Sequence, residues 1–190
     1  MKNRFEMRFT GSGGQGVILA SVIFAEAAVV KGRHAVQSQA YGPEARGGSS
    51  KAECIISRDT IWFSKVQQND FLLALTQNAL DKYAPELAED GVVMIDESLS
   101  APAFLDSERV VSVPILHCAR ETVGKAITAN IVAVGAINEL FGLFDEETLR
   151  EAVSRHIPAG TEDLNFRALS AGKALIGSEL RDKYLVEREN

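Results

Sequence analysis

The chain has 190 residues, is 46% hydrophobic and carries a net charge of −6 at pH 7. A chain of this length and composition is expected to fold as one domain, residues 1–190, that buries roughly 70% of its surface. The 20 lysine and arginine residues are scattered, and the sequence has neither a secretory signal nor an apolar run of membrane-spanning length. We therefore expect a cytoplasmic protein with no membrane span and no nucleic-acid partner.

The first predicted unit is a strand end at residues 6–10, a glycine-rich turn and a helix over residues 17–31. Such a turn lets backbone N–H groups face outward at a helix N-terminus, where they bind phosphate. The spacing Gly-x-Gly-x-x-Gly is met at Gly11, Gly13 and Gly16. The candidate phosphate site comprises Gly11, Ser12, Gly13, Gly14, Gln15 and Gly16, in which Ser12 adds a hydroxyl donor and Gln15 an amide.

A dinucleotide site is the first interpretation of this spacing, but the sequence lacks its second half. In NAD-binding folds an Asp or Glu about twenty residues after the turn binds the ribose. Residues 35–39 read Ala-Val-Gln-Ser-Gln and contain no acid. The turn is therefore predicted to exist without the usual NAD partner residue.

Strands and helices alternate along the rest of the chain. Strands are predicted over residues 34–39, 51–57, 71–75, 92–95 and 110–113, and helices over residues 78–88, 119–144, 146–156 and 165–183. This alternation predicts an α/β fold, a three-layer α/β/α arrangement around a mostly parallel, Rossmann-like sheet. The first helix is apolar around nearly its whole circumference, so we expect it to be buried on all sides, either inside the monomer or against a partner.

Ligands of such sheets gather beyond the carboxyl ends of the strands. The glycine turn lies at one of these ends, as do residues 76–78, residues 96–97 and the segment after Pro114. We expect these segments to surround one crevice.

Residues 39–51 form a second unusual stretch, with three glycines and a proline. Gly42-Pro43 predicts a turn, and Gly47-Gly48 permits a positive φ or the close approach of another chain or a ligand. A solvated loop with an incidental Glu44–Arg46 ion pair is one interpretation. The aromatic and arginine content favours a protein interface. The interface candidates are Tyr41, Gly42, Pro43, Glu44, Arg46, Gly47 and Gly48.

The cysteines and histidines do not predict a redox or metal centre. The two cysteines, Cys54 and Cys118, are too few for an iron–sulfur cluster, which needs about four ligands. The three histidines lack the spacing of a zinc site. Cys118 follows His117, but adjacent side chains usually point apart, so no thiolate–imidazole pair is expected. We predict no metal site and no catalytic residue in this chain.

Three stretches resemble the gamma subunit of the 2-oxoacid:ferredoxin oxidoreductases, enzymes that oxidatively decarboxylate 2-oxoacids to acyl-CoA. These stretches are residues 11–17, 41–48 and 124–130, and a weaker match at residues 162–168 introduces the last helix. They follow one another in order over roughly residues 5–175. The glycine turn alone is weak evidence, but joined to Tyr-Gly-Pro-Glu-x-Arg-Gly-Gly it is specific.

The resemblance implies a non-catalytic subunit, inactive when isolated, that contributes to the coenzyme A site and to assembly. Thiamine diphosphate and iron–sulfur clusters would then lie on alpha and beta subunits, with or without a delta subunit, and this chain would hold no cofactor of its own. Electrons would pass to ferredoxin or another acceptor through the complex. The motifs are similar in enzymes for pyruvate, 2-oxoglutarate and other 2-oxoacids, and the short separate chain favours 2-oxoglutarate slightly. An exposed partner face would also favour a homodimer of the isolated chain.

Arg46, Lys125 and Asn130 complete the candidates for binding coenzyme A. A guanidinium matches phosphate with two parallel donors, whereas an ammonium acts as a point charge. Both cations could instead contact a neighbouring subunit, and Arg46 could pair with Glu44. Asn130 lies on a predicted apolar helix, where a polar side chain needs a partner. Either a neighbouring backbone group or the ligand could be that partner.

Two other functions remain open from the residues alone. An independent NAD(P)-dependent oxidoreductase would bind NAD(P)H saturably as a purified chain, although the missing ribose acid argues against it. An assembly protein whose turn binds nothing would leave the Michaelis constant (KM) for coenzyme A unchanged when the turn or Lys125 is mutated.

Overall fold

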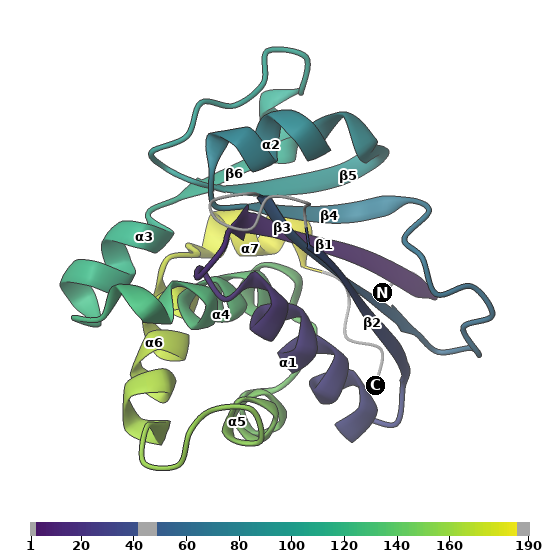
Figure 1. Ribbon diagram of the computed structural model, residues 1–190. Coiled ribbons are helices and arrows are strands. Elements are labelled where there is room, and N and C mark those ends of the chain that lie inside the picture. Colours follow the sequence, from purple (N-terminus) through teal and green to yellow (C-terminus); the bar gives the residue numbers. More distant parts are fainter. Residues whose placement is uncertain (1–2, 42–48, 186–190) are drawn as a thin grey trace.

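A single six-stranded sheet organises the computed structural model, which describes residues 3–41 and 49–185 (Figure 1). The strand order is β2-β3-β1-β4-β5-β6. The strands are β1 (Arg4–Ser12), β2 (His34–Tyr41), β3 (Ser49–Ser57), β4 (Asn69–Ala74), β5 (Leu87–Asp96) and β6 (Val110–Val113). All six predicted strands are therefore present, and the last has the predicted bounds.

The sheet is mixed, because β3 runs against both of its neighbours. Three of the five pairings are parallel, namely β1–β4, β4–β5 and β5–β6. The pairings of β3 with β1 and β2 are antiparallel. A parallel connection needs a crossover of about a dozen residues, and residues 42–48 between β2 and β3 are too few for one. The short connection therefore reverses β3 within an otherwise parallel sheet.

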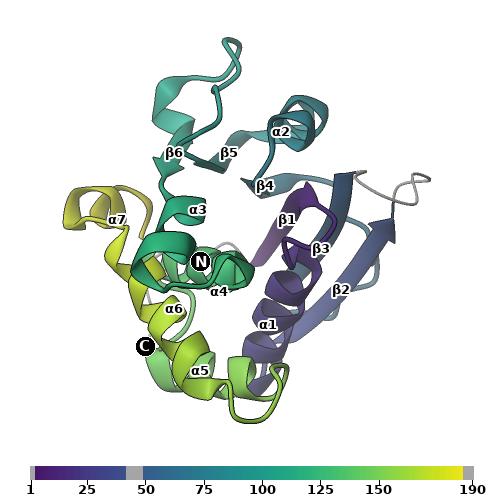
Figure 2. The ribbon, with the colours of Figure 1, turned by 60° about the vertical axis from the view of Figure 1, so that its left-hand side comes forward.

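Helices cover both faces of the sheet, as the prediction of three layers requires (Figures 1 and 2). On one face lie α1 and α4 to α6, and on the other lies α2. The helices are α1 (Val17–Val30), α2 (Gln77–Tyr83), α3 (Ile115–His117), α4 (Ala129–Phe141), α5 (Glu146–Ser154), α6 (Glu162–Ala174) and α7 (Ser178–Tyr184). No helix among the described residues is long and apolar enough to cross a membrane.

Two long predicted helices are each broken in the structure. The predicted helix over residues 119–144 is replaced by a π-helical turn that begins one residue earlier, at Cys118–Thr122, a 3₁₀ turn at Ala126–Thr128 and only then α4. Gly124, with φ of +82°, interrupts the helix because only glycine adopts this conformation at low cost. Residues 165–183 are divided between α6 and α7.

The expectation that the first helix is buried on all sides is wrong for this chain alone. α1 packs on β3, β2, α4 and α5 with one side, which buries residues such as Ile23 and Phe24. Its other side is apolar but open: Val29 is 57% exposed, and Ile18 and Val22 are partly buried. The sequence shows which residues of this helix are apolar, but it does not show which of them face solvent.

The larger core lies between the sheet and α1, α4 and α6. Aromatic rings join the layers, with ring centroids 5.7 Å apart for Phe9 and Phe24 and 5.3 Å apart for Phe71 and Phe141. α4 and α6 approach so closely that a Cβ added to Gly172 would lie 1.9 Å from the carbonyl oxygen of Val132. Glycine is therefore required at this helix crossing, which also fixes the start of α4.

A buried ionic cluster lies on the α2 side of the sheet. The Arg8 guanidinium contacts Glu53 at 2.9 Å and also Glu86, and the Lys51 ammonium lies 2.9 Å from Glu53. Burial acts to raise the pKa of the Glu53 carboxyl, but the hydrogen bond from Lys51 and the charge of Arg8 lower it below its ordinary value of 4.5. The ionised carboxylate is thus the form that the fold stabilises.

We expect Gly172→Ala to destabilise the chain by about 3 kcal/mol or more, because the added methyl group overlaps backbone of α4. This cost corresponds to a fall in Tm of about 10 °C for a domain of this size. Gly177→Ala is the matched control, since nothing lies within 4 Å of its added Cβ. Thermal unfolding of both variants tests the prediction, and equal Tm values for the two would contradict it.

We expect Glu53→Gln to cost about 2 kcal/mol at pH 7, since it removes a charged partner of buried Arg8 while Glu86 remains. Because the folded-state pKa of Glu53 is lowered, its contribution is complete above the unfolded-state pKa and is lost as the pH falls through the folded-state value. The difference from wild type should therefore shrink on acidification below about pH 4.5. Urea unfolding at several pH values measures this, with exposed Glu89→Gln, outside the Arg8 cluster, as the control; a difference independent of pH would disprove the assignment.

Candidate functional site

The glycine turn lies at the carboxyl edge of the sheet, where β1, β4, β5 and β6 all end. The β1–β3 register pairs Ser12 with Ser49 and Gly11 with Ser50, and the β2–β3 register pairs Tyr41 with Ser50. The chain positions on both sides of residues 42–48 therefore lie beside the turn. Strand pairing thus brings the glycine turn and Tyr41, the first residue of the second motif, to the same edge of the sheet.

The turn presents backbone donors at the start of α1. Gly14 and Gly16 have φ of +92° and +70°, and the Gln15 N–H donates to the Ser12 carbonyl at 3.2 Å. Gly13 and Gly14 are exposed, and nothing lies within 4 Å of a Cβ added to either. Their N–H groups make no hydrogen bond to any described residue. Together with the positive end of the α1 dipole, these donors favour an anion.

The Gln15 side chain holds the turn. Its Oε1 accepts from the Ser12 N–H at 2.7 Å, and its Nε2 donates to the Leu75 carbonyl at 3.3 Å. Both ends of the amide are therefore engaged within the chain, and the role of Gln15 as an added donor to a ligand stays a prediction that rests on the second N–H of Nε2.

The third motif reaches the turn through Asn130, at the start of α4. Asn130 is 4% exposed, and its Nδ2 donates to the Gly16 carbonyl at 3.3 Å. Of the two partners open from the sequence, the structure has the neighbouring backbone. A Cβ added to Gly16 would lie 2.6 Å from Asn130 Nδ2, so glycine at this position is needed for the contact.

Lys125 lies on an exposed bend just before α4. Gly124 starts the bend, and the Lys125 carbonyl accepts from both the N–H and the hydroxyl of Thr128, at 3.0 and 2.7 Å. The Lys125 side chain is exposed. Neighbouring Ile127 is 77% exposed. This bend therefore presents a cation, Lys125, and an apolar side chain, Ile127, shortly before Asn130 in the chain.

Comparison with known proteins agrees with this arrangement of motifs. Residues 6–175 match the family model described as pyruvate ferredoxin/flavodoxin oxidoreductase. The chain belongs to this family. The resemblance to gamma subunits that the sequence motifs indicated is therefore confirmed.

Relatives of two kinds share this pyruvate ferredoxin/flavodoxin oxidoreductase domain. The 2-oxoglutarate synthase subunit KorC of Methanocaldococcus jannaschii is 42% identical over 90% of this chain and 94% of its own length. The ketoisovalerate oxidoreductase subunit VorA of Methanothermobacter thermautotrophicus is 39% identical over 87% of this chain, but the match covers only 35% of VorA. The same domain thus occurs both as a separate chain and as part of a longer one.

Solved structures of the family have the same fold. The gamma subunit of a keto/oxoacid ferredoxin oxidoreductase from Geobacter sulfurreducens is 44% identical, with a TM-score of 0.79 over 90% of this chain and 95% of that one. A 2-oxoglutarate:ferredoxin oxidoreductase from Magnetococcus marinus, 23% identical, aligns with a TM-score of 0.78 over 92% of this chain and 31% of that chain. At that identity the second match supports the fold alone.

The remaining members of the predicted site are described only in part. Tyr41 is placed as the last residue of β2, and the candidates Gly42, Pro43, Glu44, Arg46, Gly47 and Gly48 lie outside the described residues. Ser12 is partly exposed and is the last residue of β1, where it pairs with Ser49 of β3. Its hydroxyl stays a candidate donor.

Other polar residues at the carboxyl edge hold the fold together. Thr76 caps α2 by accepting from the Ala79 N–H. Buried Asp96 accepts from the Ser98 N–H at 3.1 Å and from the Leu116 N–H at 2.7 Å, which links the end of β5 to α3. Sequence reasoning placed these residues near the turn but could not foresee that their side chains are already engaged.

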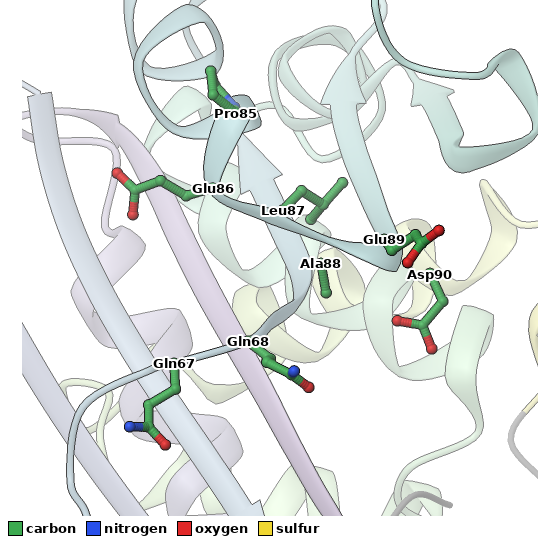
Figure 3. A pocket seen from close by; sticks show the side chains of 8 residues that line it. All are labelled: Gln67, Gln68, Pro85, Glu86, Leu87, Ala88, Glu89 and Asp90. Atoms are coloured by element: carbon green, nitrogen blue, oxygen red, sulfur yellow. The ribbon is translucent and has the colours of Figure 1, made fainter.

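A separate cavity of about 480 Å³ lies at the opposite edge, where β4 and β5 begin (Figure 3). Its lining includes Glu86, Glu89 and Asp90. Because this cavity lies at the amino ends of β4 and β5 and the turn lies at the carboxyl edge, the cavity is not an extension of the glycine-turn site.

Neither cysteine is suited to nucleophilic chemistry. Cys54 and Cys118 are buried, and burial raises the pKa of each thiol. His117 is exposed while Cys118 is buried, so the two side chains point apart as expected. Within residues 3–41 and 49–185, no group of three or more His, Cys, Asp or Glu side chains is placed to hold a metal ion.

Proposed function

We propose that this chain is the non-catalytic gamma subunit of a 2-oxoacid:ferredoxin oxidoreductase, which converts a 2-oxoacid to acyl-CoA, and that it forms part of the coenzyme A site. The observation that carries the proposal is the glycine turn, whose exposed Gly13 and Gly14 N–H groups have no partner among the described residues. The pyrophosphate of coenzyme A is an anion of the kind that such a helix N-terminus binds.

Lys125 is proposed as a second contact for coenzyme A. It lies on the exposed bend that leads into α4, and Asn130 of the same motif touches Gly16. Its ammonium would neutralise part of the charge of a bound phosphate. Arg46 lies outside the described residues and is proposed for the same role from its sequence motif alone. Among the described residues of this edge, the Asp96 carboxylate is engaged by the Ser98 and Leu116 N–H groups, so we propose that the contribution of the chain is to position the coenzyme A thiol.

The partner subunits would supply the redox chemistry. We propose that thiamine diphosphate and the iron–sulfur clusters lie on alpha and beta subunits, with or without a delta subunit, and carry out decarboxylation and electron transfer to ferredoxin. The relative VorA supports a close association, since there the same domain is part of a chain about three times as long. A separate gamma chain must form the corresponding contacts without a covalent link.

The open face of α1 is the proposed docking surface for these partners. Ile18, Val22 and Val29 recur at helical spacing on its solvent side. Apolar side chains repeated in this way are typical of a helix that packs against another element. A homodimer of the isolated chain would cover the same face in the absence of partners.

We propose 2-oxoglutarate as the substrate of the assembled complex. Relatives that are 37–42% identical to this chain carry the name 2-oxoglutarate synthase subunit. Dye reduction by the captured complex with a panel of 2-oxoacids tests this choice, and preference for a branched-chain 2-oxoacid would replace it. The isolated chain should reduce no dye with any of them.

Gly13→Val tests the coenzyme A site directly. The valine side chain should enter the space that the phosphate occupies and raise the KM for coenzyme A in the reconstituted complex by roughly tenfold to a hundredfold. The variant chain should fold normally, because the position is open and its φ is not positive. Steady-state assays at varied coenzyme A measure the effect.

The smaller Gly13→Ala serves as a graded control and should raise the KM less. An unchanged KM for coenzyme A with Gly13→Val, and equally with Lys125→Ala, would instead favour an assembly protein whose turn binds no ligand. Saturable NAD(P)H binding by the purified chain would point to the dinucleotide interpretation.

Val29→Glu tests the docking surface. A carboxylate on the open face of α1 should reduce co-purification of the partner subunits severalfold, since it would have to be desolvated in the interface. The Tm of the isolated chain should change little, because Val29 is already 57% exposed. Val29→Ala is the matched control, and undiminished assembly of the glutamate variant would exclude this face.

A further inference from the structure

Two side-chain amides hold the glycine turn from opposite sides. Gln15 links it to the end of β4, through the Ser12 N–H at 2.7 Å and the Leu75 carbonyl at 3.3 Å. Asn130 links it to the start of α4, through the Gly16 carbonyl at 3.3 Å. The turn is therefore fixed relative to three elements, β1, β4 and α4.

The glycines of the turn fall into two groups by the space around them. A Cβ at Gly11 would lie 2.5 Å from Gln15 Oε1, and one at Gly16 would lie 2.6 Å from Asn130 Nδ2. At Gly13 and Gly14 nothing lies within 4 Å. The outer two glycines thus give room to the two amides, and the inner two are left open to solvent.

We infer that Gln15 and Asn130 are positioning residues, which contact the turn and not the ligand and which orient the Gly13 and Gly14 N–H groups toward an incoming phosphate. The inference rests on the proposed coenzyme A site. Its physical basis is that glycine-rich backbone has unusual conformational freedom, which must be lost when a ligand orders it. Two hydrogen bonds that fix the turn beforehand remove most of this cost from binding.

The surroundings of Asn130 support a positioning role over a merely structural one. Its neighbours in α4, including Ile131 and Val132, are buried and apolar. A carboxamide at this position would be costly without a partner, and the partner it has is the turn. The three atoms nearest to a Cβ added at Gly16 all belong to the Asn130 side chain, so glycine at this position makes room for this contact.

The test compares Asn130→Asp and Gln15→Glu in the reconstituted complex. Each variant keeps the shape and an acceptor oxygen but loses the N–H that donates to the turn or to Leu75. We expect each to raise the KM for coenzyme A about tenfold. The KM for the 2-oxoacid and kcat at saturating coenzyme A should stay within about twofold, a split that general destabilisation would not produce.

Asn138→Asp is the matched control on the same helix. Asn138 exchanges two hydrogen bonds with the backbone of Phe144, each 3.0 Å long, at the far end of α4 from the turn. Its replacement should lower the Tm by an amount similar to Asn130→Asp and leave the KM for coenzyme A unchanged. An equal rise in KM for both variants would overturn the inference.

The double variant that combines Gln15→Glu with Asn130→Asp gives a second test of the inference. Since both amides act on one turn, the combined effect on the KM for coenzyme A should be smaller than the product of the two single effects. Strictly multiplicative effects would mean that the two residues act independently and would contradict a shared role. If Asn130→Asp fails to assemble, partly exposed Gln15→Glu carries the KM test alone.

Failure of the positioning role can be told apart from failure of the proposed coenzyme A site. If Gly13→Val raises the KM for coenzyme A but neither amide variant does, the positioning role is wrong and the coenzyme A site stands. If Gly13→Val has no effect, the coenzyme A site itself is wrong.

Discussion

The antiparallel pairing of β1 with β3 is the constraint on which the other features depend. It runs the whole length of both strands, from Arg4 opposite Ser57 to Ser12 opposite Ser49. In its middle it places Arg8 opposite Glu53, the pair at the centre of the buried ionic cluster. At its end it places the glycine turn beside the boundaries of residues 42–48. A shift of one residue would turn every side chain of β3 to the other face and lose both arrangements.

The second constraint is the close crossing of α4 and α6. Gly172 allows the backbone of α6 to approach the carbonyl of Val132 in α4. Gly135 in turn allows the backbone of α4 to approach the carbonyl of Leu169 in α6. The N-terminus of α4 then has a fixed place relative to the sheet, and Asn130 reaches Gly16. The position of Asn130 at the turn thus depends on the packing of α4 against α6.

Much of the fold could be predicted from the sequence, because its signals are local. Buried runs such as Phe71–Leu75 and the helix after Gly16 are evident in short windows. The reversal of β3 was also encoded, in the short connection at residues 42–48. The continuous helix over 119–144 was predicted wrongly, since apolar residues continue past Gly124 and only the backbone conformation of this residue reveals the break.

The site was predictable as a set of positions but not as a set of roles. The motifs identified Gln15 and Asn130, yet what each side chain does depends on partners far along the chain. Gln15 contacts Leu75 across 60 positions, and Asn130 contacts Gly16 across 114. No local pattern contains such pairs, so a sequence shows that a polar residue needs a partner without showing which one it has.

Under the proposed function, assembly and ligand binding share one element, helix α1. α1 carries the glycine turn at its N-terminus and the apolar face of Ile18, Val22 and Val29 along its solvent side. Docking of a partner on that face would fix the direction in which the turn presents its N–H groups. Under the proposed function, a chain whose role is to position a ligand could then still govern acyl-CoA formation, because the helix that would hold the phosphate would also determine how the partner subunit is aligned with it. The longer relatives, in which this domain is part of one chain, would meet the same requirement by covalent connection.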